Sequence, residues 1–415
     1  MSKGRRTFIK GSAVLAAAGV VGNARAEPWL QMISDGLLSS ASKSADVPGV
    51  VAMATNRTDT VYQGAFGQRV LGQEAPMTLD TVFWIASMTK ALTGAAAMQL
   101  VERGKLELDA PAGHLLAELE RTQVLEGWSE DGQPKLRAPK RPITLRHLLT
   151  HTAGFAYDIW NGDLVRYQKL KNIPGIISCQ NAALLTPLLS DPGERWTYGI
   201  NIDWAGKMVE AASGKKLGAY MQENLFAPIG MKDTGFKITP DMRARLAKIH
   251  QRGDDGKLAP TDIEIPQNPE FEMGGGGLYS TAGDYLKFLR LILNRGKAGS
   301  EQVLKPETVD LMSRNAMGDN KVTLLKTQMP PLSADAEFFP GIAKSWGLSF
   351  MINDKEAPTG RSAGSLGWAG LANTYFWIDP SKQLAGVYLT QVLPFADTKA
   401  LPLFYAFEKT VYGNA

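Results

Sequence analysis

The tetrad Ser87-Met88-Thr89-Lys90 stands between an apolar run, Val82 to Ala86, and an alanine-rich stretch, Ala91 to Val101. This order predicts a buried strand that passes directly into a helix, with the serine in the first helical turn. Backbone N–H groups without partners and the positive end of the helix dipole favour an oxyanion there. Because residues three positions apart share a helix face, Lys90 can reach the Ser87 hydroxyl.

The side chains of the tetrad indicate acyl transfer through a covalent serine. A serine hydroxyl is a weak nucleophile that needs an adjacent base, and a lysine serves when burial or nearby positive charge lowers its pKa. Two further Ser-x-x-Lys matches, Ser40 to Lys43 and Ser213 to Lys216, lack a hydrophobic seat. Ser87 is therefore the candidate nucleophile, and the alternative is that it only caps a helix.

The first 26 residues have the pattern of an export signal. Arg5-Arg6 precedes a short apolar span, Ala13 to Val21, and a small-x-small site that ends at Ala26. The span is too short to cross a membrane, so the segment is expected to be removed on export. The paired arginines are typical of the twin-arginine export machinery, which carries folded proteins; a general secretory signal is the alternative. We expect a periplasmic protein that starts at Glu27 and has no membrane anchor.

The charge of the chain depends on that segment. The sequence holds 45 basic and 41 acidic residues, and five of the basic residues but none of the acidic ones lie in residues 1–26. The exported chain would therefore carry 40 basic against 41 acidic residues. Such a balance indicates neither a nucleic acid nor an anionic membrane as a partner.

Stability is expected to come from a hydrophobic core. Cys179 is the only cysteine, so no disulfide within the chain is possible. Hydrophobic residues make up 44% of the chain, which supplies enough apolar surface for one large domain or two joined domains.

No metal ion or other cofactor is expected. His147 and His151 have the i, i+4 spacing of a helical metal pair, but no Glu lies between them and no third ligand is apparent. His151 is instead expected in a helix-ending turn that Gly154 closes. The four glycines at 274–277 lack the Gly-Lys-Ser/Thr ending of a phosphate loop and predict a tight turn.

The pattern along the chain predicts an α/β frame with a helical insertion. Two strand-like runs, 49–54 and 60–66, indicate a hairpin across a polar turn. Later strands and a last helix are expected at 346–352, 373–378, 384–390 and 402–412. Between the hairpin and these later strands, from about 111 to 245, the sequence predicts a mostly helical stretch that Pro and Gly residues break. The predicted domains are α/β over 27–110 and 246–415, and helical over 111–245.

Four motifs in order carry a resemblance to a known family: Ser87-Met88-Thr89-Lys90, Ile143 to Gly154, Trp196-Thr197-Tyr198 and Gly367 to Gly370. Together they resemble the serine β-lactamase and penicillin-binding superfamily, and within it most closely the class-C-like carboxylesterases of family VIII. The resemblance covers nearly all of the chain after residue 26. It implies an antiparallel sheet flanked by helices, an all-helical domain, and an active site in the cleft between them.

The resemblance also implies roles for individual residues. Ser87 would be the nucleophile, Lys90 its base or proton relay, and Tyr198 the second proton-transfer group. A phenolate form of Tyr198 is expected, because a lysine ammonium nearby lowers a tyrosine pKa. The backbone N–H groups of Ser87 and Leu371 would form the oxyanion hole, and Gly370 would let substrate lie close to the strand edge.

The departures from β-lactamases favour an uncharged ester as substrate. Trp368 stands where those enzymes place a lysine that holds the β-lactam carboxylate, so that its apolar face would contact the substrate instead, and Ile200 stands where they place an asparagine. Family VIII esterases are similar to this chain at both positions. Asp203 also matches the esterase pattern, which implies hydrogen bonds to the tyrosine segment; an exposed helix carboxylate is the alternative.

Aromatic residues after the predicted glycine turn are candidates for substrate contact. Trp160 and Phe155 are expected to line a pocket, whereas Trp84, Trp196 and Trp346 are expected to pack in the core.

These observations predict a serine hydrolase that cleaves uncharged carboxylic esters through an acyl-serine, with a small-molecule ester as its partner and no cofactor. A β-lactamase or D-amino-acid peptidase would use the same machinery, and a non-catalytic penicillin-binding-like module would share only the scaffold. The motifs leave the acyl-chain length open, as well as the choice between water and an alcohol as acyl acceptor.

Overall fold

A seven-stranded antiparallel sheet forms the centre of the molecule. The computed structural model describes Met1 and residues 28–413, so the expected export signal lies outside the described residues except for Met1. The strands follow the order β11-β12-β13-β14-β15-β1-β2. They are β1 (Gly49–Thr55), β2 (Thr60–Gly67), β11 (Lys344–Trp346), β12 (Met351–Asn353), β13 (Leu366–Gly370), β14 (Thr374–Asp379) and β15 (Leu384–Leu389).

The first strand of the chain pairs with one of the last. β1 runs antiparallel to β15, with Val51 opposite Leu389, and antiparallel to β2, with Val51 opposite Ala65. The predicted hairpin of β1 and β2 is therefore confirmed. β1 is buried along its whole length, which explains why its sequence is apolar from Gly49 to Ala54.

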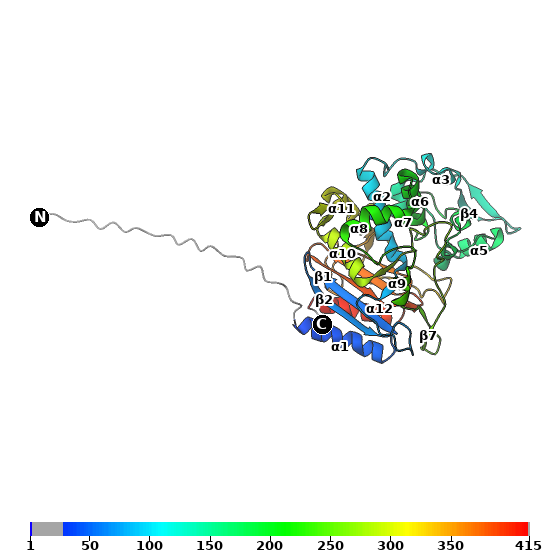
Figure 1. Cartoon of the computed structure of the whole chain (residues 1–415). Helices are drawn as coiled ribbons and strands as arrows, with labels where there is room; N and C mark the ends of the chain where they lie inside the picture. The colour runs from blue at the N-terminus through cyan, green and yellow to red at the C-terminus, as the bar shows by residue number, and fades with distance from the viewer. Residues whose placement is uncertain (2–27, 414–415) are drawn as a thin grey trace.

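Helices cover both faces of the sheet (Figure 1). α1 (Pro28–Lys43) and α12 (Ala400–Val411) pack together on one face, where the rings of Tyr375 and Phe404 stack with centroids 4.5 Å apart. α10 (Ala282–Leu293) packs against β1, β14 and β15 on the other face, and α11 (Pro306–Met312) follows it in the chain. The predicted fold class, an antiparallel sheet flanked by helices, is confirmed, as is the final helix.

One predicted strand is a hairpin. The apolar run at 346–352 contains the turn between β11 and β12, where Ser349 has φ 81° and Gly347 N–H donates to Phe350 O at 2.8 Å. The prediction of one strand was wrong because apolar residues continue through the turn. Shorter strands complete the fold: β3 (Val82–Trp84) with β8 (Tyr279–Thr281), β16 (Val392–Leu393) with β6 (His250–Arg252) and β7 (Leu258–Pro260), and β9 (Lys297–Ala298) with β10 (Glu301–Gln302).

The inserted segment is not entirely helical. A hairpin of β4 (Val124–Trp128) and β5 (Pro134–Arg137) lies within it, and the expectation of an all-helical domain is corrected in this respect. Its helices are α3 (Ala117–Arg121), α4 (Leu145–Leu149), α5 (Gly162–Lys171), α6 (Asn201–Ser213), α7 (Leu217–Met221), α8 (Ala227–Ile229) and α9 (Pro240–Ala244). Short 3-10 turns and a π-helical turn connect them. The domain boundaries at 111 and 245 stay a prediction.

The insertion and the sheet domain share a helix interface. α2 (Thr89–Glu102), which follows Ser87, packs against α6 of the insertion. In the part of the chain that the structure describes, no helix is both long and apolar enough to cross a membrane.

Candidate active site

Ser87 lies in a tight turn between a strand and a helix. β3 ends at Trp84, residues Ala86–Met88 form a 3-10 turn, and α2 begins at Thr89. Ala86 has φ 43°, a left-handed conformation that alanine seldom adopts. Ser87 is half-buried and lies in the 3-10 turn directly before α2, rather than in the first turn of the helix as predicted. Lys90 occupies the first turn of α2.

Lys90 is the buried partner of Ser87. Its Nζ lies 3.0 Å from Ser87 Oγ, 3.1 Å from Tyr157 Oη and 2.6 Å from the carbonyl oxygen of Gly275. Burial lowers the pKa of Lys90 to about 7, and the negative charge of Asp203 acts against that change. A neutral amine that can accept the serine proton is therefore available near pH 7.

Tyr198 lies on the other side of Ser87 as a protonated phenol. Burial raises the pKa of Tyr198, although hydrogen bonds to Ser87 and Trp368 act against the rise. The phenolate expected for Tyr198 is therefore not favoured, because burial, together with the negative charge of Asp203, raises the pKa of the phenol. The Lys90 Nζ lies 4.7 Å from the centre of the Tyr198 ring. The phenol can donate a proton to a leaving alcohol or pass one on.

Trp368 binds the tyrosine. Its Nε1 donates to Tyr198 Oη at 2.8 Å, and its ring lies edge-on to Trp346 with centroids 4.7 Å apart. Only 5% of Trp368 is exposed. The expected contact with substrate is therefore replaced by a contact that positions Tyr198.

Tyr157 and Asp203 form a buried polar layer behind Lys90. The Asp203 carboxylate accepts a hydrogen bond from Gly275 N–H at 2.8 Å and interacts with the Tyr157 hydroxyl. Burial raises the Asp203 pKa to about 6, and the charge of Lys90 acts in the opposite direction. Asp203 is fully buried, so the alternative of an exposed carboxylate is wrong. Hydrogen bonds from Asp203 to the segment of Tyr198 were expected. Its carboxylate instead binds Gly275 N–H, and its charge favours the ammonium form of Lys90.

Tyr157 was not identified from the sequence. It lies in the aromatic stretch with Phe155 and Trp160, but no spacing rule connects it with a lysine on another element. The concentration of aromatic residues in that stretch was the only available signal.

The predicted glycine turn at 274–277 is confirmed and also belongs to the site. The N–H groups of Gly276 and Gly277 both donate to Met273 O, which closes the turn. A Cβ atom on Gly275 would lie 2.5 Å from Asp203 Oδ2, so only glycine fits there. The turn supplies an acceptor for Lys90 and a donor for Asp203.

The end of β13 packs closely against the turn that holds Ser87. A Cβ atom on Gly370, the last residue of β13, would lie 2.3 Å from the carbonyl oxygen of Ile85. Gly370 therefore allows β13 to approach the turn of Ser87, rather than giving space to a substrate as expected. Leu371 comes next and lines the same cavity as Ser87, so the N–H groups of these two residues stay the predicted oxyanion hole.

A small apolar cavity opens at Ser87. Of the described residues that line it, none carries a charge; they include Trp84, Tyr157, Ile159, Trp160, Ile176, Ile177, Met273 and Leu371. Trp160 lines the cavity as expected. Phe155 does not, because it is fully buried and stacks on Trp204 with ring centroids 6.2 Å apart.

A polar cavity lies on the other side of the tyrosines. Tyr157 and Trp160 border both cavities, whereas Tyr198 borders only the polar one. Arg195 and Lys326 also line the polar cavity. Ser87 therefore borders the apolar cavity, and Tyr198 borders the polar one.

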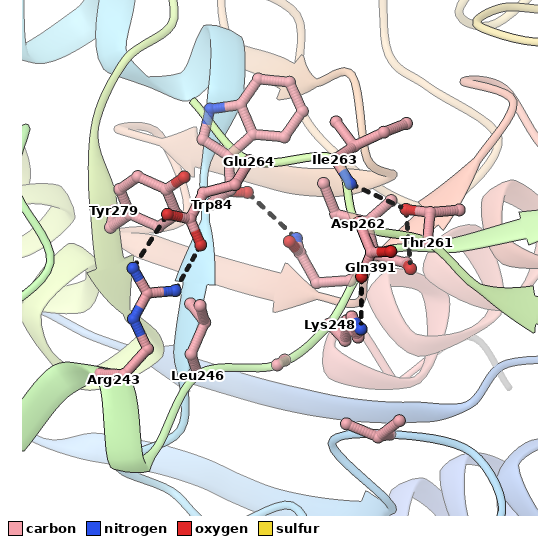
Figure 2. A pocket seen from close by; sticks show the side chains of 13 residues that line it. Trp84, Arg243, Leu246, Lys248, Thr261, Asp262, Ile263, Glu264, Tyr279 and Gln391 are labelled. Carbon is pink, nitrogen blue, oxygen red and sulfur yellow. Dashed lines mark hydrogen bonds and ion pairs between the residues drawn. The ribbon is translucent and has the colours of Figure 1, made fainter. Parts of the chain in front are cut away.

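A third and larger cavity lies behind Trp84 (Figure 2). Its walls combine aliphatic residues with two ion pairs, Arg243 to Glu264 and Lys248 to Asp262. Trp84 lines this cavity as well as the one at Ser87, although it was expected only to pack in the core.

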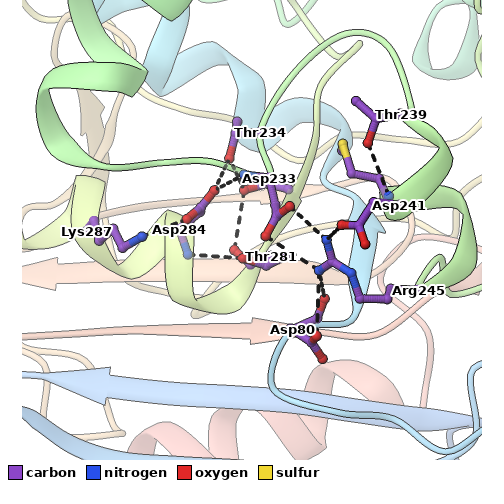
Figure 3. A network of polar contacts seen from close by, with 11 residues as sticks. Asp80, Asp233, Thr234, Thr239, Asp241, Arg245, Thr281, Asp284 and Lys287 are labelled. Carbon is purple, nitrogen blue, oxygen red and sulfur yellow. Dashed lines mark hydrogen bonds and ion pairs between the residues drawn. The ribbon is translucent and has the colours of Figure 1, made fainter.

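An arginine at the end of the insertion holds the strand in front of Ser87 (Figure 3). The Arg245 guanidinium donates to Asp80 O at 2.6 Å, lies 2.8 Å from the carboxylate of Asp233 and pairs with Asp241. The backbone of Arg245 accepts a hydrogen bond from Val82 N–H at 3.0 Å. This network joins the returning chain to β3, and so to the nucleophile turn.

The two histidines do not share a site. His151 is buried with φ 57° in the turn after α4, where its ring lies 4.7 Å from that of Tyr198; Gly154 follows with φ 103°. His147 Nδ1 accepts a hydrogen bond from Thr144 N–H at the start of α4. The prediction of a helix-ending turn is confirmed. Among the described residues, no group of three or more His, Cys, Asp or Glu side chains could hold a metal ion.

The sheet, the inserted helices and the Ser-Lys-Tyr arrangement define a serine enzyme with the β-lactamase and penicillin-binding fold. The model of the β-lactamase family matches residues 35–407, and the chain belongs to this family.

Similar proteins include both acyltransferases and an esterase. Monacolin J acid methylbutanoyltransferase of Aspergillus terreus is 35% identical over 390 residues, which cover 90% of this chain and 94% of that protein. Lovastatin esterase of Penicillium rubens is 31% identical over 398 residues, covering 91% and 97%. A solved mutant of simvastatin synthase from Aspergillus terreus has a TM-score of 0.82 at 35% identity, covering 92% and 96%.

Proposed function

We propose that this protein is a serine hydrolase that cleaves uncharged carboxylic esters through an acyl-Ser87 intermediate. The observation that carries the proposal is the position of Lys90, whose fully buried Nζ lies 3.0 Å from Ser87 Oγ. Because burial lowers its pKa to about 7, a large share of the amine is neutral where a base is needed. A buried lysine with a lowered pKa beside a serine hydroxyl is typical of a catalytic base and favours an enzyme over a non-catalytic module.

Each proton in the reaction has an assigned carrier. Ser87 Oγ attacks the ester carbonyl carbon while Lys90 Nζ takes its proton, and the oxyanion rests on the N–H groups of Ser87 and Leu371. When the carbon–oxygen bond of the ester breaks, Tyr198 Oη gives its proton to the alcohol and is left as a phenolate near the Lys90 ammonium, which still holds the proton taken from Ser87. Water then attacks the acyl-serine and gives a proton to the Tyr198 phenolate, and Lys90 returns its proton to Ser87 Oγ as the acid leaves.

The electrostatics of the cavity support an uncharged acyl group. The described residues that line the cavity at Ser87 are apolar or aromatic apart from Ser87 itself, two glycines and the Tyr157 hydroxyl. An anionic acyl group would lose its hydration there without gaining a partner. Trp368, in the position where β-lactamases carry a lysine, uses its indole N–H on Tyr198.

Transfer of the acyl group to an alcohol is a second candidate function. It is favoured by the similarity to a methylbutanoyltransferase and by the polar cavity beside Tyr198. An alcohol in that cavity could exchange its proton with Tyr198 and replace water as the acyl acceptor.

We also propose that the protein is exported to the periplasm by the twin-arginine machinery. The proposal is supported by Arg5-Arg6, the short apolar span after it and the small residues before Glu27.

The leading experiment replaces the nucleophile. Ser87→Ala is expected to lower kcat/KM on p-nitrophenyl butyrate by about a thousandfold or more, because the covalent step is lost. Intact-mass spectrometry of the wild type should show one acyl group, and Ser87→Ala should show none. Ser40→Ala is the matched control, since Ser40 begins another Ser-x-x-Lys tetrad and is exposed.

The same assay separates the alternatives. A loss of less than about a hundredfold in Ser87→Ala would contradict a covalent role for Ser87. Nitrocefin turnover equal to ester turnover would favour a β-lactamase. Formation of a new ester when an alcohol is added, at the expense of free acid, would favour the acyltransferase.

A further inference from the structure

We propose that the indole of Trp84 limits the length of the acyl chain that Ser87 accepts, because it separates the apolar cavity at Ser87 from the larger cavity behind it. The inference rests on the proposed acyl-serine chemistry and assigns a substrate property to the same site. It applies to straight-chain acyl groups, which can extend from one cavity into the other once the indole is removed.

Trp84 is the common wall of the two cavities. It lines both the small cavity at Ser87 and the larger cavity behind β3, and only 3% of it is exposed. In β3 it pairs with Tyr279 of β8, and Figure 2 shows both residues at the same side of the larger cavity.

The wall is held in place. Trp84 Nε1 donates to Gly276 O at 2.7 Å, and Gly276 itself lines the cavity at Ser87. The backbone oxygen of Trp84 accepts a hydrogen bond from Gln391 Nε2 at 3.0 Å. Turning the indole aside would break this buried hydrogen bond and leave both of its groups without a partner. A long acyl chain would therefore meet a fixed obstacle.

The acyl chain, rather than the alcohol, lies toward Trp84. The alcohol exchanges a proton with Tyr198, and Tyr198 lines the polar cavity but not the cavity at Ser87. The apolar cavity, with Ile159, Ile177 and Met273 in its walls, is left for the acyl chain.

The larger cavity offers an apolar path beyond the wall. Leu246, Ile249 and Ile263 line it, and its charged groups are paired with each other. Removing the indole should let methylene groups leave water and contact these residues.

The experiment compares chain-length profiles. The wild type and Trp84→Ala are assayed with p-nitrophenyl esters from acetate to dodecanoate. The ratio of kcat/KM for decanoate to that for butyrate should rise by about tenfold or more in Trp84→Ala, since each newly buried methylene contributes about 0.8 kcal/mol. Trp84→Phe, which keeps most of the wall, should raise the ratio less. Adding Leu246→Phe to Trp84→Ala should lower the ratio again by refilling the larger cavity.

A folded Trp84→Ala variant with the chain-length profile of the wild type would overturn the proposal. If that variant does not fold, Trp84→Leu gives the same comparison with a smaller loss of volume. Labelling of Ser87 by ethyl and decyl fluorophosphonates, followed by intact mass, tests the wall without ester turnover. A protein that is labelled but hydrolyses no ester would refute the proposed function alone, whereas equal decyl-to-ethyl ratios in wild type and variant would refute the wall alone.

Discussion

At the scale of single residues, the site depends on the balance of charge around one buried amine. Lys90 faces Ser87, Tyr157 and Tyr198, and the nearest carboxylate is that of Asp203. Burial favours the neutral amine, while Asp203 favours the ammonium. His151, buried nearby, has a pKa far below its usual value because of burial and the charge of Lys90, so it adds no positive charge.

This balance predicts a pH dependence. Because the neutral amine is the base, kcat/KM should rise with pH through about 7 and level off above it. Asp203→Asn keeps the acceptor for Gly275 N–H but removes the charge that favours the ammonium. The midpoint should therefore move to lower pH, as measured with an ester that does not ionise. A midpoint that stays in place or moves upward would show that Asp203 does not set the protonation of Lys90.

The nucleophile and its immediate partners were predictable because local order marks them. The apolar run before Ser87 and the helix after it define a strand–turn–helix junction, and the resemblance supplied Tyr198. Tyr157 and the roles of Trp368 and Gly370 were not predictable, since each depends on what a distant segment places beside it. The pKa of Tyr198 was also misjudged, because burial cannot be read from a motif.

At the scale of elements, the predictions succeed where a local pattern continues for the length of the element. The hairpin of β1 and β2 and the helix α12 have such patterns. The turn between β11 and β12 is hidden by apolar neighbours on both sides. The hairpin of β4 and β5 was missed although Asp131-Gly132 is a typical hairpin signal, because proline breaks around it indicated helix ends.

The attachment of α12 to the sheet gives a prediction on stability. The Arg361 guanidinium donates twice to the carboxylate of Glu408 at 2.9 Å, and both side chains are almost fully buried. Arg361→Ala leaves the Glu408 charge buried without its partner, so the free energy of unfolding should fall by about 3–5 kcal/mol. Urea denaturation followed by circular dichroism measures the change. The double variant Arg361→Met with Glu408→Leu should recover most of the loss, and an equal loss in both would contradict this account.

At the scale of the whole molecule, the active site lies where two parts of the chain meet. Ser87, Lys90 and Trp368 come from the elements around the seven-stranded sheet, and Tyr157, Tyr198 and Asp203 come from residues 157–203. The order of the motifs that hold Ser87 and Tyr198 could be predicted from the sequence, because each motif has its own local pattern. The pairing of β1 with β15 could not, since neither strand shows which distant strand will lie beside it.

The proposed export gives a prediction for the intact protein. When expressed with residues 1–26 in a bacterium that has a twin-arginine system, the protein should be recovered from the periplasm with Glu27 as its first residue. Replacing Arg5-Arg6 by two lysines should leave it in the cytoplasm with an intact N-terminus. Continued export of that variant would instead indicate a general secretory signal. Cell fractionation with N-terminal sequencing distinguishes these outcomes.

The pairing of β1 with β15 determines when the sheet can be completed. Val51 needs Leu389 as its neighbour, so the strand that leaves the ribosome first waits for one that is made near the end of synthesis. Until then the hydrogen-bonding edge of β1 stays open to strands from other chains. A delay before β15 is made therefore exposes a newly made molecule to aggregation through this edge. Shortening the chain before β15 would remove this partner and prevent the sheet from closing.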